Sequence, residues 1–477
     1  MPSPAALRHS QSASSASASE DSAVESDSNL SSKQNGVAET RLPKTIEVVE
    51  APAWPTHLVN VERDVGKSVG QRLFHWGPLL AFGIIFTIGL TTLIVHLEYW
   101  KLTEPLALVN MTVFLYFNYG VMVNLIRASH VGGGYVTRGW KPPNSEDEKK
   151  LQYCASCEGY KAPRSHHCKK CNRCVMKMDH HCPWINNCVG HRNHVYFIKF
   201  LFFAVIGCFH AVLILGFILW HTLSTIFYRG TPQYYKKAPS PYLIRSLSTF
   251  IFVLLSISFA VGVIIAVGVL LYTQIKAVLT NKTGIEDYIC AKVVYRGGTE
   301  EFTYPYDLGK RRNWSEVFSS FWASYPKGNG IWWPIRSNCS QFSLSIEQII
   351  QKTNKRYAAH IFDITESGPG GICGGRKAGI KALICQPCSD EPRISIKKGE
   401  AYAVTRINKH WLYGQRLLQP PIPLRDDSED EIHGPFSENP YEDRINRDKL
   451  AIKQSLEPRG WFPRAFTKHR PRPRRDD

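Results

Sequence analysis

The chain has 477 residues, enough for two or three folded units, and a formal net charge of +18 at pH 7. Such a charge suits nucleic acid, anionic lipid or a phosphorylated ligand, and composition alone does not choose among them. No signal peptide opens the chain, and the early acids Glu20, Asp21, Glu25 and Asp27 argue against a mitochondrial transit peptide.

Residues 1–60 form the first predicted region, a disordered tail. The first 40 residues are rich in Ser and Ala and contain few apolar side chains from which to build a core. We therefore expect folded structure to begin after this tail.

Four apolar blocks follow. They run from Pro78 to Leu97, from Leu106 to Ile126, from Phe197 to Trp220 and from Leu247 to Tyr272. Each block is about 20 residues long and nearly free of charge, which matches a helix that crosses a bilayer core. A charged group at mid-membrane costs at least ~2.5 kcal/mol, so such clean stretches are rarely accidental. The alternative, four buried helices of a soluble protein, would need an unusually large core. The sequence therefore predicts an α-helical integral membrane protein, with two transmembrane helices within residues 75–127 and two within residues 197–272.

The distribution of Lys and Arg indicates the orientation of these helices. Segment 128–196 is rich in both residues, Lys67 and Arg72 precede the first block, and Lys276 and Lys282 follow the fourth. The loop between the third and fourth blocks, on the opposite side, is also basic, so the difference in Lys and Arg content between the two sides is moderate. The positive-inside rule places both termini and segment 128–196 in the cytosol, where thiols stay reduced.

Segment 128–196 contains a dense cysteine cluster. Seven of the 13 cysteines lie between Cys154 and Cys188, in the pattern C-x2-C-x9-H-C-x2-C-x2-C-x4-D-H-H-C-x5-C. Cysteines two residues apart are typical of tetrahedral zinc sites, and a reducing compartment favours metal over disulfides. Six of the seven Cys and two His would supply the eight ligands of two zinc sites, which leaves one Cys without a metal. A thiol beside two His and one Asp, as in Asp179 to Cys182, is the arrangement that nucleophilic catalysis needs.

The run DHHCPWINNC at 179–188, the spacing of the whole cluster and its place between the second and third spans resemble the DHHC family of protein S-acyltransferases. The resemblance covers about residues 75–325 and implies a zinc domain at 151–190. It implies that Cys182 is the acylated nucleophile, His180 the general base and Asp179 its orienting partner. It also implies two structural Zn²⁺ ions, one held by Cys154, Cys157, His167 and Cys174, the other by Cys168, Cys171, His181 and Cys188.

The implied reaction moves a long acyl group such as palmitoyl from acyl-CoA to cysteine thiols of mainly membrane proteins, through a thioester on Cys182. The acyl chain would lie between the four helices, where each buried CH₂ contributes ~0.8 kcal/mol. Lys161, Arg164 and His166 resemble positions that meet the CoA phosphates. A solvated basic face is the alternative for these three residues.

Residues 273–356 are expected to form a cytosolic tail that docks on the core. The run NKTGIE from Asn281 to Glu286 resembles the family's TTxE motif, with Gly284 in place of the second Thr. The stretch from Tyr306 to Trp314, including Asn313, resembles the family's aromatic–Asn motif. We expect both to act as structural braces, followed by an amphipathic helix from Ser343 to Lys355.

Residues 357–468 predict a small β-barrel. Short β-runs at Arg393–Ile396, Ala401–Ile407 and Trp411–Tyr413 are separated by Gly and Pro. The segments PRISIKKGE, HWLYG and RGWFPRAF resemble the later strands of an SH3 domain, although no ALYDY-like stretch precedes them. An acidic, Pro-containing insertion at 420–457 splits the module, and a basic tail spans 469–477.

A DHHC core followed by such a module resembles an endoplasmic-reticulum branch of the family. This resemblance implies residence in that membrane, membrane-protein substrates and an accessory protein of the selenoprotein K type. Cys373, Cys385 and Cys388 lie in the module as ordinary barrel cysteines or, as the sharper hypothesis, as S-acylation sites that tether it to the membrane.

Two other functions deserve comparison. A zinc-finger nucleic-acid binder fits the charge and the Cys/His spacing, but four membrane spans and the lack of a basic recognition helix oppose it. A membrane scaffold with a dead site is opposed by the intact run from Asp179 to Cys182.

Overall fold

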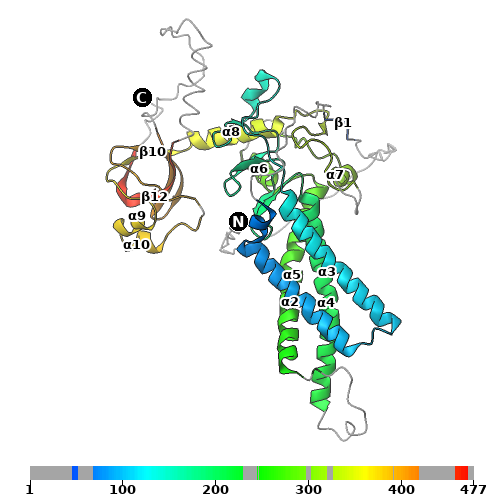
Figure 1. Ribbon diagram of the computed structural model, residues 1–477. Coiled ribbons are helices and arrows are strands. Elements are labelled where there is room, and N and C mark those ends of the chain that lie inside the picture. The colour runs from blue at the N-terminus through cyan, green and yellow to red at the C-terminus, as the bar shows by residue number, and fades with distance from the viewer. Residues whose placement is uncertain are drawn as a thin grey trace, which may run out of the picture. The chain divides into compact units, whose positions relative to one another are not determined.

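The computed structural model describes residues 46–51, 68–228, 244, 246–296, 302–319, 326–389, 391–417 and 457–470 (Figure 1). Most of the predicted tail at 1–60 and nearly all of the predicted insertion at 420–457 lie outside these residues, as does the end of the basic tail after residue 470.

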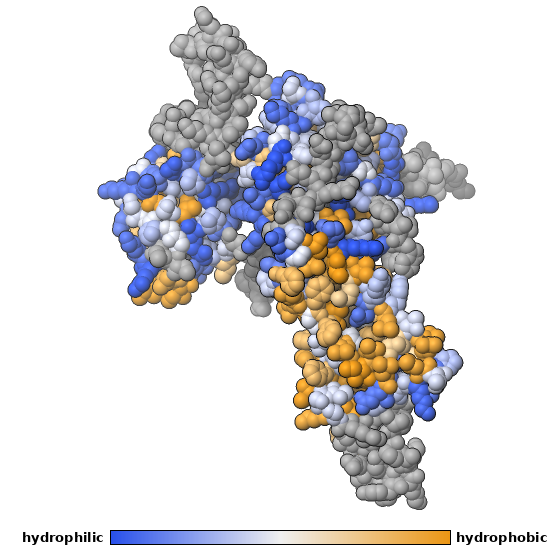
Figure 2. All heavy atoms as spheres, in the orientation of Figure 1, coloured by the Kyte–Doolittle hydropathy of each residue, from blue (hydrophilic) through white to orange (hydrophobic). Residues whose placement is uncertain are grey.

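Four long helices confirm the four predicted spans. They are α2 (Trp76–Tyr99), α3 (Pro105–Val131), α4 (His194–Tyr228) and α5 (Leu247–Leu279). All four are long and apolar enough to cross a membrane. Their outward side chains are themselves apolar, for example Phe86, Leu106 and Ile265, each more than 60% exposed. On the face of the bundle seen in Figure 2, hydrophobic residues cover much of the surface, which suits contact with lipid.

The helix ends nearest the cysteine cluster are fixed by polar contacts. A short helix, α1 (Val69–Leu73), precedes α2 and is closed by a capping box between Ser68 and Gln71. Arg72 of α1 donates to the carbonyl of Ser129 near the end of α3. The side chain of Asn187 donates to that same carbonyl, so the start of α2, the end of α3 and the cysteine cluster are held together.

Between α3 and α4 the chain forms a short 3-10 helix (Ser145–Lys150) and three β-hairpins. The hairpins pair β2 (Tyr153–Cys154) with β3 (Gly159–Tyr160), β4 (His166–Cys168) with β5 (Arg173–Val175), and β6 (His180–Cys182) with β7 (Asn187–Val189). Each turn contains one residue with positive φ, at Glu158, Asn172 and Asn186. Asn tolerates this left-handed conformation better than most residues, which favours the tight turns.

After α5, the helices α6 (Gly284–Arg296), α7 (Lys310–Val317) and α8 (Ser343–Tyr357) cover the hairpins and the end of α5. Asn313 of α7 donates to the carbonyl of Leu279 at the end of α5, and Gln152 beside the first hairpin bonds Gln348 of α8. The predicted amphipathic helix is therefore present as α8, two residues longer than expected.

The predicted disordered tail at 1–60 contains one short segment that is ordered in the structure. Val48 and Val49 form strand β1 (Val48–Val49), which pairs with β8 (Ile335–Arg336). The segment is short, and a partner nearly 300 residues away supplies the pairing, so local composition gave no sign of it.

The C-terminal module contains a five-stranded antiparallel sheet in the order β12-β11-β10-β9-β13. The strands are β9 (His360–Ile364), β10 (Ala401–Asn408), β11 (Trp411–Arg416), β12 (Arg459–Pro463) and β13 (Thr467–Arg470), with a 3-10 turn (Arg464–Phe466) before the last. Phe362, Tyr402, Leu412 and Phe462 form its core.

The structure differs from the prediction for this module in three places. The run Arg393–Ile396 forms isolated bridges to Trp461 and Gly368 rather than a strand. Between β9 and β10 the chain also forms two short helices, α9 (Ile372–Lys377) and α10 (Ile380–Ile384). Strand β13 extends to Arg470, into the predicted basic tail, because Arg470 pairs with Ile361 and bonds Asp363.

Candidate active site and metal centres

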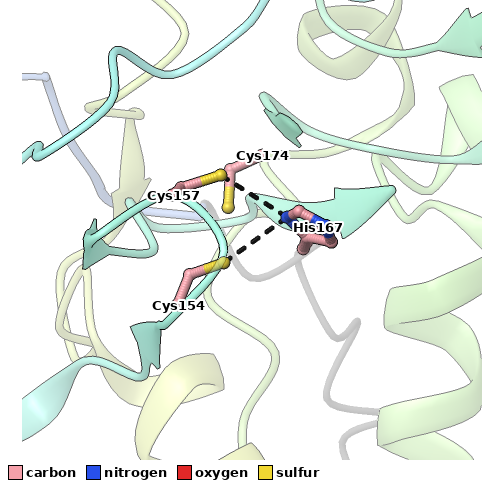
Figure 3. Close-up of side chains that lie close together, drawn as sticks. All are labelled: Cys154, Cys157, His167 and Cys174. Atoms are coloured by element: carbon pink, nitrogen blue, oxygen red, sulfur yellow. Dashed lines mark hydrogen bonds between the residues drawn. The ribbon is translucent and has the colours of Figure 1, made fainter. Parts of the chain in front are cut away.

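Among the residues that the structure describes, two sets of four side chains could each hold a metal ion. Within each set the ligand atoms all lie within 4.8 Å of one another. The first set is Cys154, Cys157, His167 and Cys174, and the second is Cys168, Cys171, His181 and Cys188. In the first, Nδ1 of His167 is 3.4 Å from both Sγ of Cys154 and Sγ of Cys157 (Figure 3). Three sulfurs and one nitrogen at this spacing fit a tetrahedral centre, and the two sets match the predicted partition.

The division of the ligands into two sets follows from the hairpins, which repeat every 14 residues. This repeat was not predicted from the sequence. Cys154, Cys168 and Cys182 are spaced by 14 and occupy the same position in successive hairpins. Each complete metal set combines the two turn cysteines of one hairpin with a cross-strand His–Cys pair of the next, His167↔Cys174 or His181↔Cys188. The hairpins thus form a chain in which each metal set joins two neighbours.

The third hairpin leaves Cys182 outside both sets. Its turn has Ile185 where the first two hairpins have a second cysteine, Cys157 or Cys171. Helix α4 follows directly, so no fourth hairpin supplies a His–Cys pair. Cys182 therefore occupies the hairpin position that supplies a metal ligand in the first two hairpins, but the other three ligands of a set are missing. Its thiol is free.

The side chains of Asp179 and His180 form a hydrogen-bonded pair next to this thiol. Oδ2 of Asp179 lies 2.6 Å from Nδ1 of His180, which fixes the proton on Nδ1 and leaves Nε2 for other contacts. The ring of His180 packs edge-on against Phe197 of α4, with centroids 5.4 Å apart. Asp179 and Cys182 are only 5% and 3% exposed, so the group is largely shielded from water.

Two further elements hold Asp179 in place, through contacts that were not predicted from the sequence. Gln274 of α5 donates to Oδ2 of Asp179 at 3.0 Å, and its own carbonyl oxygen lies 2.8 Å from Nε2 of His194 in α4. The backbone N–H of Gly284 donates to Oδ1 at 2.7 Å. Because this bond comes from the backbone, Gly284 supplies it without the hydroxyl of the family's Thr.

These contacts set the charges of the pair. Burial lowers the pKa of His180, but hydrogen bonds with Asp179 and Cys182 outweigh burial and raise the pKa to about 9. Burial raises the pKa of Asp179, but the hydrogen bond and charge of His180 hold that pKa well below its usual range. At neutral pH His180 is therefore a cation that hydrogen-bonds the Cys182 sulfur and carries a proton that it can donate.

Cys182 lines a cavity of about 430 Å³ among the four long helices. Trp184 and Phe197 lie near the thiol, and Ile88, Phe114 and Cys208 lie at the deep end, where they pack into a buried cluster with Ala211 and Ala260. Gly77 at the start of α2 lies against Pro183, and a rise of 1.5 Å per residue puts Ile88 on the order of 16 Å further along. The thiol therefore stands at one end of a long, mostly apolar chamber of ligand-binding size.

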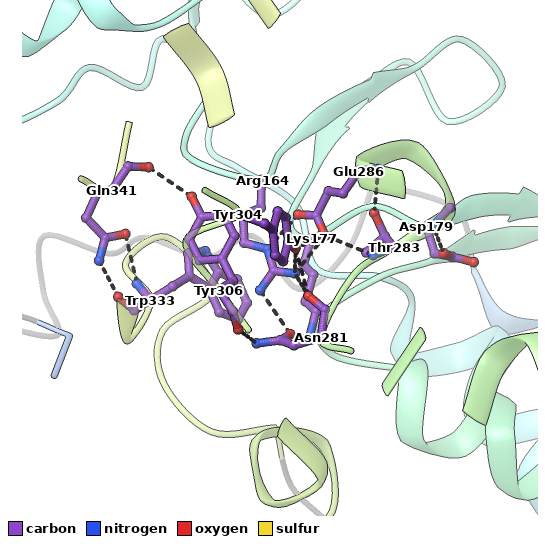
Figure 4. Close-up of polar contacts among 11 residues, drawn as sticks. Arg164, Lys177, Asp179, Asn281, Thr283, Glu286, Tyr304, Tyr306, Trp333 and Gln341 are labelled. Atoms are coloured by element: carbon purple, nitrogen blue, oxygen red, sulfur yellow. Dashed lines mark hydrogen bonds and ion pairs between the residues drawn. The ribbon is translucent and has the colours of Figure 1, made fainter. Parts of the chain in front are cut away.

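A buried ion pair braces the hairpins against the chain after α5. Arg164 contacts both carboxylate oxygens of Glu286, at 2.6 and 2.8 Å, and both side chains are fully buried (Figure 4). Arg164 also donates to the carbonyl of Asn281 and lies over the rings of Tyr306 and Trp333. Arg164, which the resemblance assigned to the CoA phosphates, is thus buried in this structure, with its guanidinium engaged by Glu286.

The other two residues assigned to CoA lie together. Lys161 and His166 line a small pocket with Gln152 and Gln348, and Nε2 of His166 is buried without a hydrogen-bond partner among the described residues.

The predicted tail motifs act as braces. Thr283 and Glu286 cap the start of α6 through mutual bonds, which also orient Glu286 toward Arg164. Tyr306 is fully buried, and Asn313 bonds Asp307 and the end of α5. In the C-terminal module, Cys385 and Cys388 are exposed. The side chain of Cys373 lies outside the described residues.

The sequence is similar to a known protein family and to several known proteins. Residues 147–291 match the family model described as DHHC palmitoyltransferase. The chain is 39% identical over 410 residues to palmitoyltransferase ZDHHC6 of Mus musculus, covering 83% of this chain and 91% of the relative. It is 42% identical over 362 residues to palmitoyltransferase ZDHHC6 of Homo sapiens, covering 73% and 86%. A probable protein S-acyltransferase 16 of Arabidopsis thaliana is 32% identical over 262 residues, covering 52% and 85%.

Proposed function

The chain belongs to the DHHC palmitoyltransferase family and is a membrane-embedded protein S-palmitoyltransferase, and from this premise we propose that Cys182 carries the acyl group. The observation that carries the proposal is a buried thiol, free of both metal sets, between the Asp179–His180 pair and a mostly apolar cavity.

In the first step, the Cys182 thiolate attacks the thioester carbonyl of a long-chain acyl-CoA. The bond from the carbonyl carbon to the CoA sulfur breaks, and the departing thiolate takes the proton held on His180. In the second step, His180 accepts the proton of a substrate cysteine, whose sulfur attacks the acyl-enzyme and releases Cys182. Both steps exchange one thioester for another, so neither needs an energy source or an oxidant.

Asp179 acts by holding His180 in one tautomer and stabilising its positive charge. The cavity holds the acyl chain, with roughly 0.8 kcal/mol gained per buried CH₂. Lys161 and His166 remain the proposed contacts for the CoA phosphates, with Arg164 assigned instead to the brace.

The two metal sets are proposed to hold Zn²⁺. Three thiolates and one imidazole per site is a closed structural set for this ion, and the ions would lock successive hairpins together. Changing Cys174 to Ser is expected to lower bound zinc from two ions per chain to one, as measured by elemental analysis. Changing Cys290 to Ser, outside both sets, should leave two.

Location, partners and the C-terminal module complete the proposal. We assign the chain to the endoplasmic-reticulum membrane with the hairpins and both termini in the cytosol, and its substrates to proteins of that membrane. The five-stranded sheet is proposed to be an SH3-like docking module, and an accessory protein of the selenoprotein K type to assist catalysis. Cys373, Cys385 and Cys388 are proposed acylation sites, which is compatible with the exposure of the last two.

Labelled palmitoyl-CoA tests the catalytic assignment. The purified full chain should take up label that hydroxylamine removes and pass it to a cysteine-containing substrate. Changing Cys182 to Ser should abolish both reactions, while Cys290→Ser should preserve them. Equal labelling of the Cys182→Ser protein would overturn the assignment, and absence of any labelling would favour a scaffold.

A further inference from the structure

Helix α10 presents two isoleucines to the outside of the C-terminal module. Ile380 and Ile384 are each 75% exposed, and their spacing of four residues puts them on one face of the helix. The helix is nevertheless held firmly: Ala382 is 3% exposed, and its carbonyl accepts a 2.9 Å hydrogen bond from the indole of Trp411. The exposure of the isoleucines is therefore set by the fold of the module.

The surroundings of these isoleucines are basic. Arg376, Lys377 and Lys381 are exposed, and the structure gives none of them an acidic partner among the described residues. The sequence has no acid between Glu366 and Asp390. Figure 2 shows hydrophobic residues gathered at the edge of the module where Figure 1 labels α10, with hydrophilic residues beside them.

Single exposed apolar residues are common on soluble proteins, but this combination is more specific. A helix that presents bulky apolar side chains beside several unpaired cations is typical of segments that lie at the surface of an anionic membrane. The module belongs to the same chain as the four candidate membrane spans, α2 to α5, and is therefore covalently tethered to them. Tethering of this kind raises the effective concentration, and a surface with only two apolar anchors can suffice.

We propose that Arg376, Lys377, Ile380, Lys381 and Ile384 form a lipid-contact surface. The isoleucines enter the boundary between headgroups and acyl chains, and the three cations meet anionic headgroups. The contact forms without any acyl modification. It places the exposed thiols of Cys385 and Cys388, which follow α10 directly, at the membrane surface where acyl donors partition.

Photochemical crosslinking in the full chain tests the proposal. Benzoylphenylalanine replaces Ile384 in one variant and Ile407 in a matched control, because Ile407 is an exposed isoleucine of the same module, 50% exposed, on strand β10. Each variant is treated with hydroxylamine to remove thioester-linked acyl groups and placed in nanodiscs with or without phosphatidylserine. After irradiation, lipid adducts are quantified by mass spectrometry.

The expected result is at least a threefold higher lipid adduct from position 384 than from position 407, with a further rise when phosphatidylserine is present. Lys377→Glu with Lys381→Glu should remove that rise and leave acyl transfer by Cys182 unchanged. Adducts from position 384 to a second copy of the chain or to another protein, or lipid adducts equal to those from 407, would overturn the proposal.

Discussion

Gly77 allows the first membrane helix to touch the hairpin that bears Cys182. A Cβ at this position would lie 1.9 Å from the carbonyl oxygen of Pro183 and 2.7 Å from its carbonyl carbon, both backbone atoms that cannot swing away. Gly77→Ala should therefore displace the hairpin, lower stability by about 1–3 kcal/mol and slow acylation by about tenfold or more. The rate of label uptake from palmitoyl-CoA measures this.

Gly83 provides a control in the same helix. A Cβ there meets no atom within 4 Å, so Gly83→Ala should keep wild-type activity. Equal rates for the two variants would show that close contact between α2 and Pro183 is unimportant.

Gln274 is predicted to act through Asp179. Gln274→Leu removes a hydrogen bond to a buried carboxylate, a loss of about 1–3 kcal/mol, so kcat should fall about 10- to 100-fold. Since Gln274 is a positioning residue and does not line the cavity, the KM for palmitoyl-CoA should stay unchanged. Thr273→Val, at the exposed neighbouring position, is the control. A change in KM alone would contradict the assignment.

At the residue scale, the DHHC motif identifies side chains that are neighbours in the sequence. Asp179, His180 and Cys182 are within four residues of one another, and the structure brings them together. The contact of Arg164 with Glu286 was not predicted, because Glu286 is 122 residues away and nothing in the local sequence identifies a buried arginine. Gln274 was also missed: it follows the fourth apolar block, in the last turns of α5, and Asp179 is 95 residues away in sequence.

At the scale of elements, the pair Arg164–Glu286 joins the hairpins to α6 and should dominate the stability of that junction. Glu286→Gln leaves a buried guanidinium without its counter-charge and should cost about 3–5 kcal/mol, visible as a lower Tm in detergent. Arg164→Met combined with Glu286→Leu should recover much of this loss, because no unpaired charge remains.

An exposed pair serves as the comparison. Glu146 and Lys149 also form an ion pair, but their side chains are 70% and 46% exposed. Glu146→Gln should therefore change stability by less than about 1 kcal/mol. A similar Tm for Glu286→Gln and Glu146→Gln would contradict the brace.

The four long helices, α2 to α5, were predictable because each apolar block is long enough to indicate a membrane-spanning helix. The hairpin repeat was not, since its three copies share only part of their chemistry. Tyr153 and Tyr160 stand where later copies have His and Cys, and Ile185 stands where earlier copies have Cys. The equivalence appears only when the strands are paired. Strand β1 and helices α9 and α10 were also missed, because each is short and depends on partners distant in sequence.

At the scale of the whole molecule, the four spans supply most of the cavity lining and the hairpins supply the thiol of Cys182. The spans enclose a mostly apolar chamber, and the hairpins, whose two Cys/His sets could each hold a metal ion, bring the thiol of Cys182 to the end of that chamber. Neither part alone would place a reactive sulfur beside a cavity in the bilayer.

A palmitoyl-CoA analogue with a photoreactive diazirine near the methyl end of its chain tests this arrangement most directly. After loading, irradiation and digestion, we expect a thioester on Cys182 and crosslinks to the deep lining at Ile88, Phe114 or Cys208, all lost in Cys182→Ser. Crosslinks confined to bulk lipid or to the surface of the hairpins, with Cys182 loaded, would contradict it.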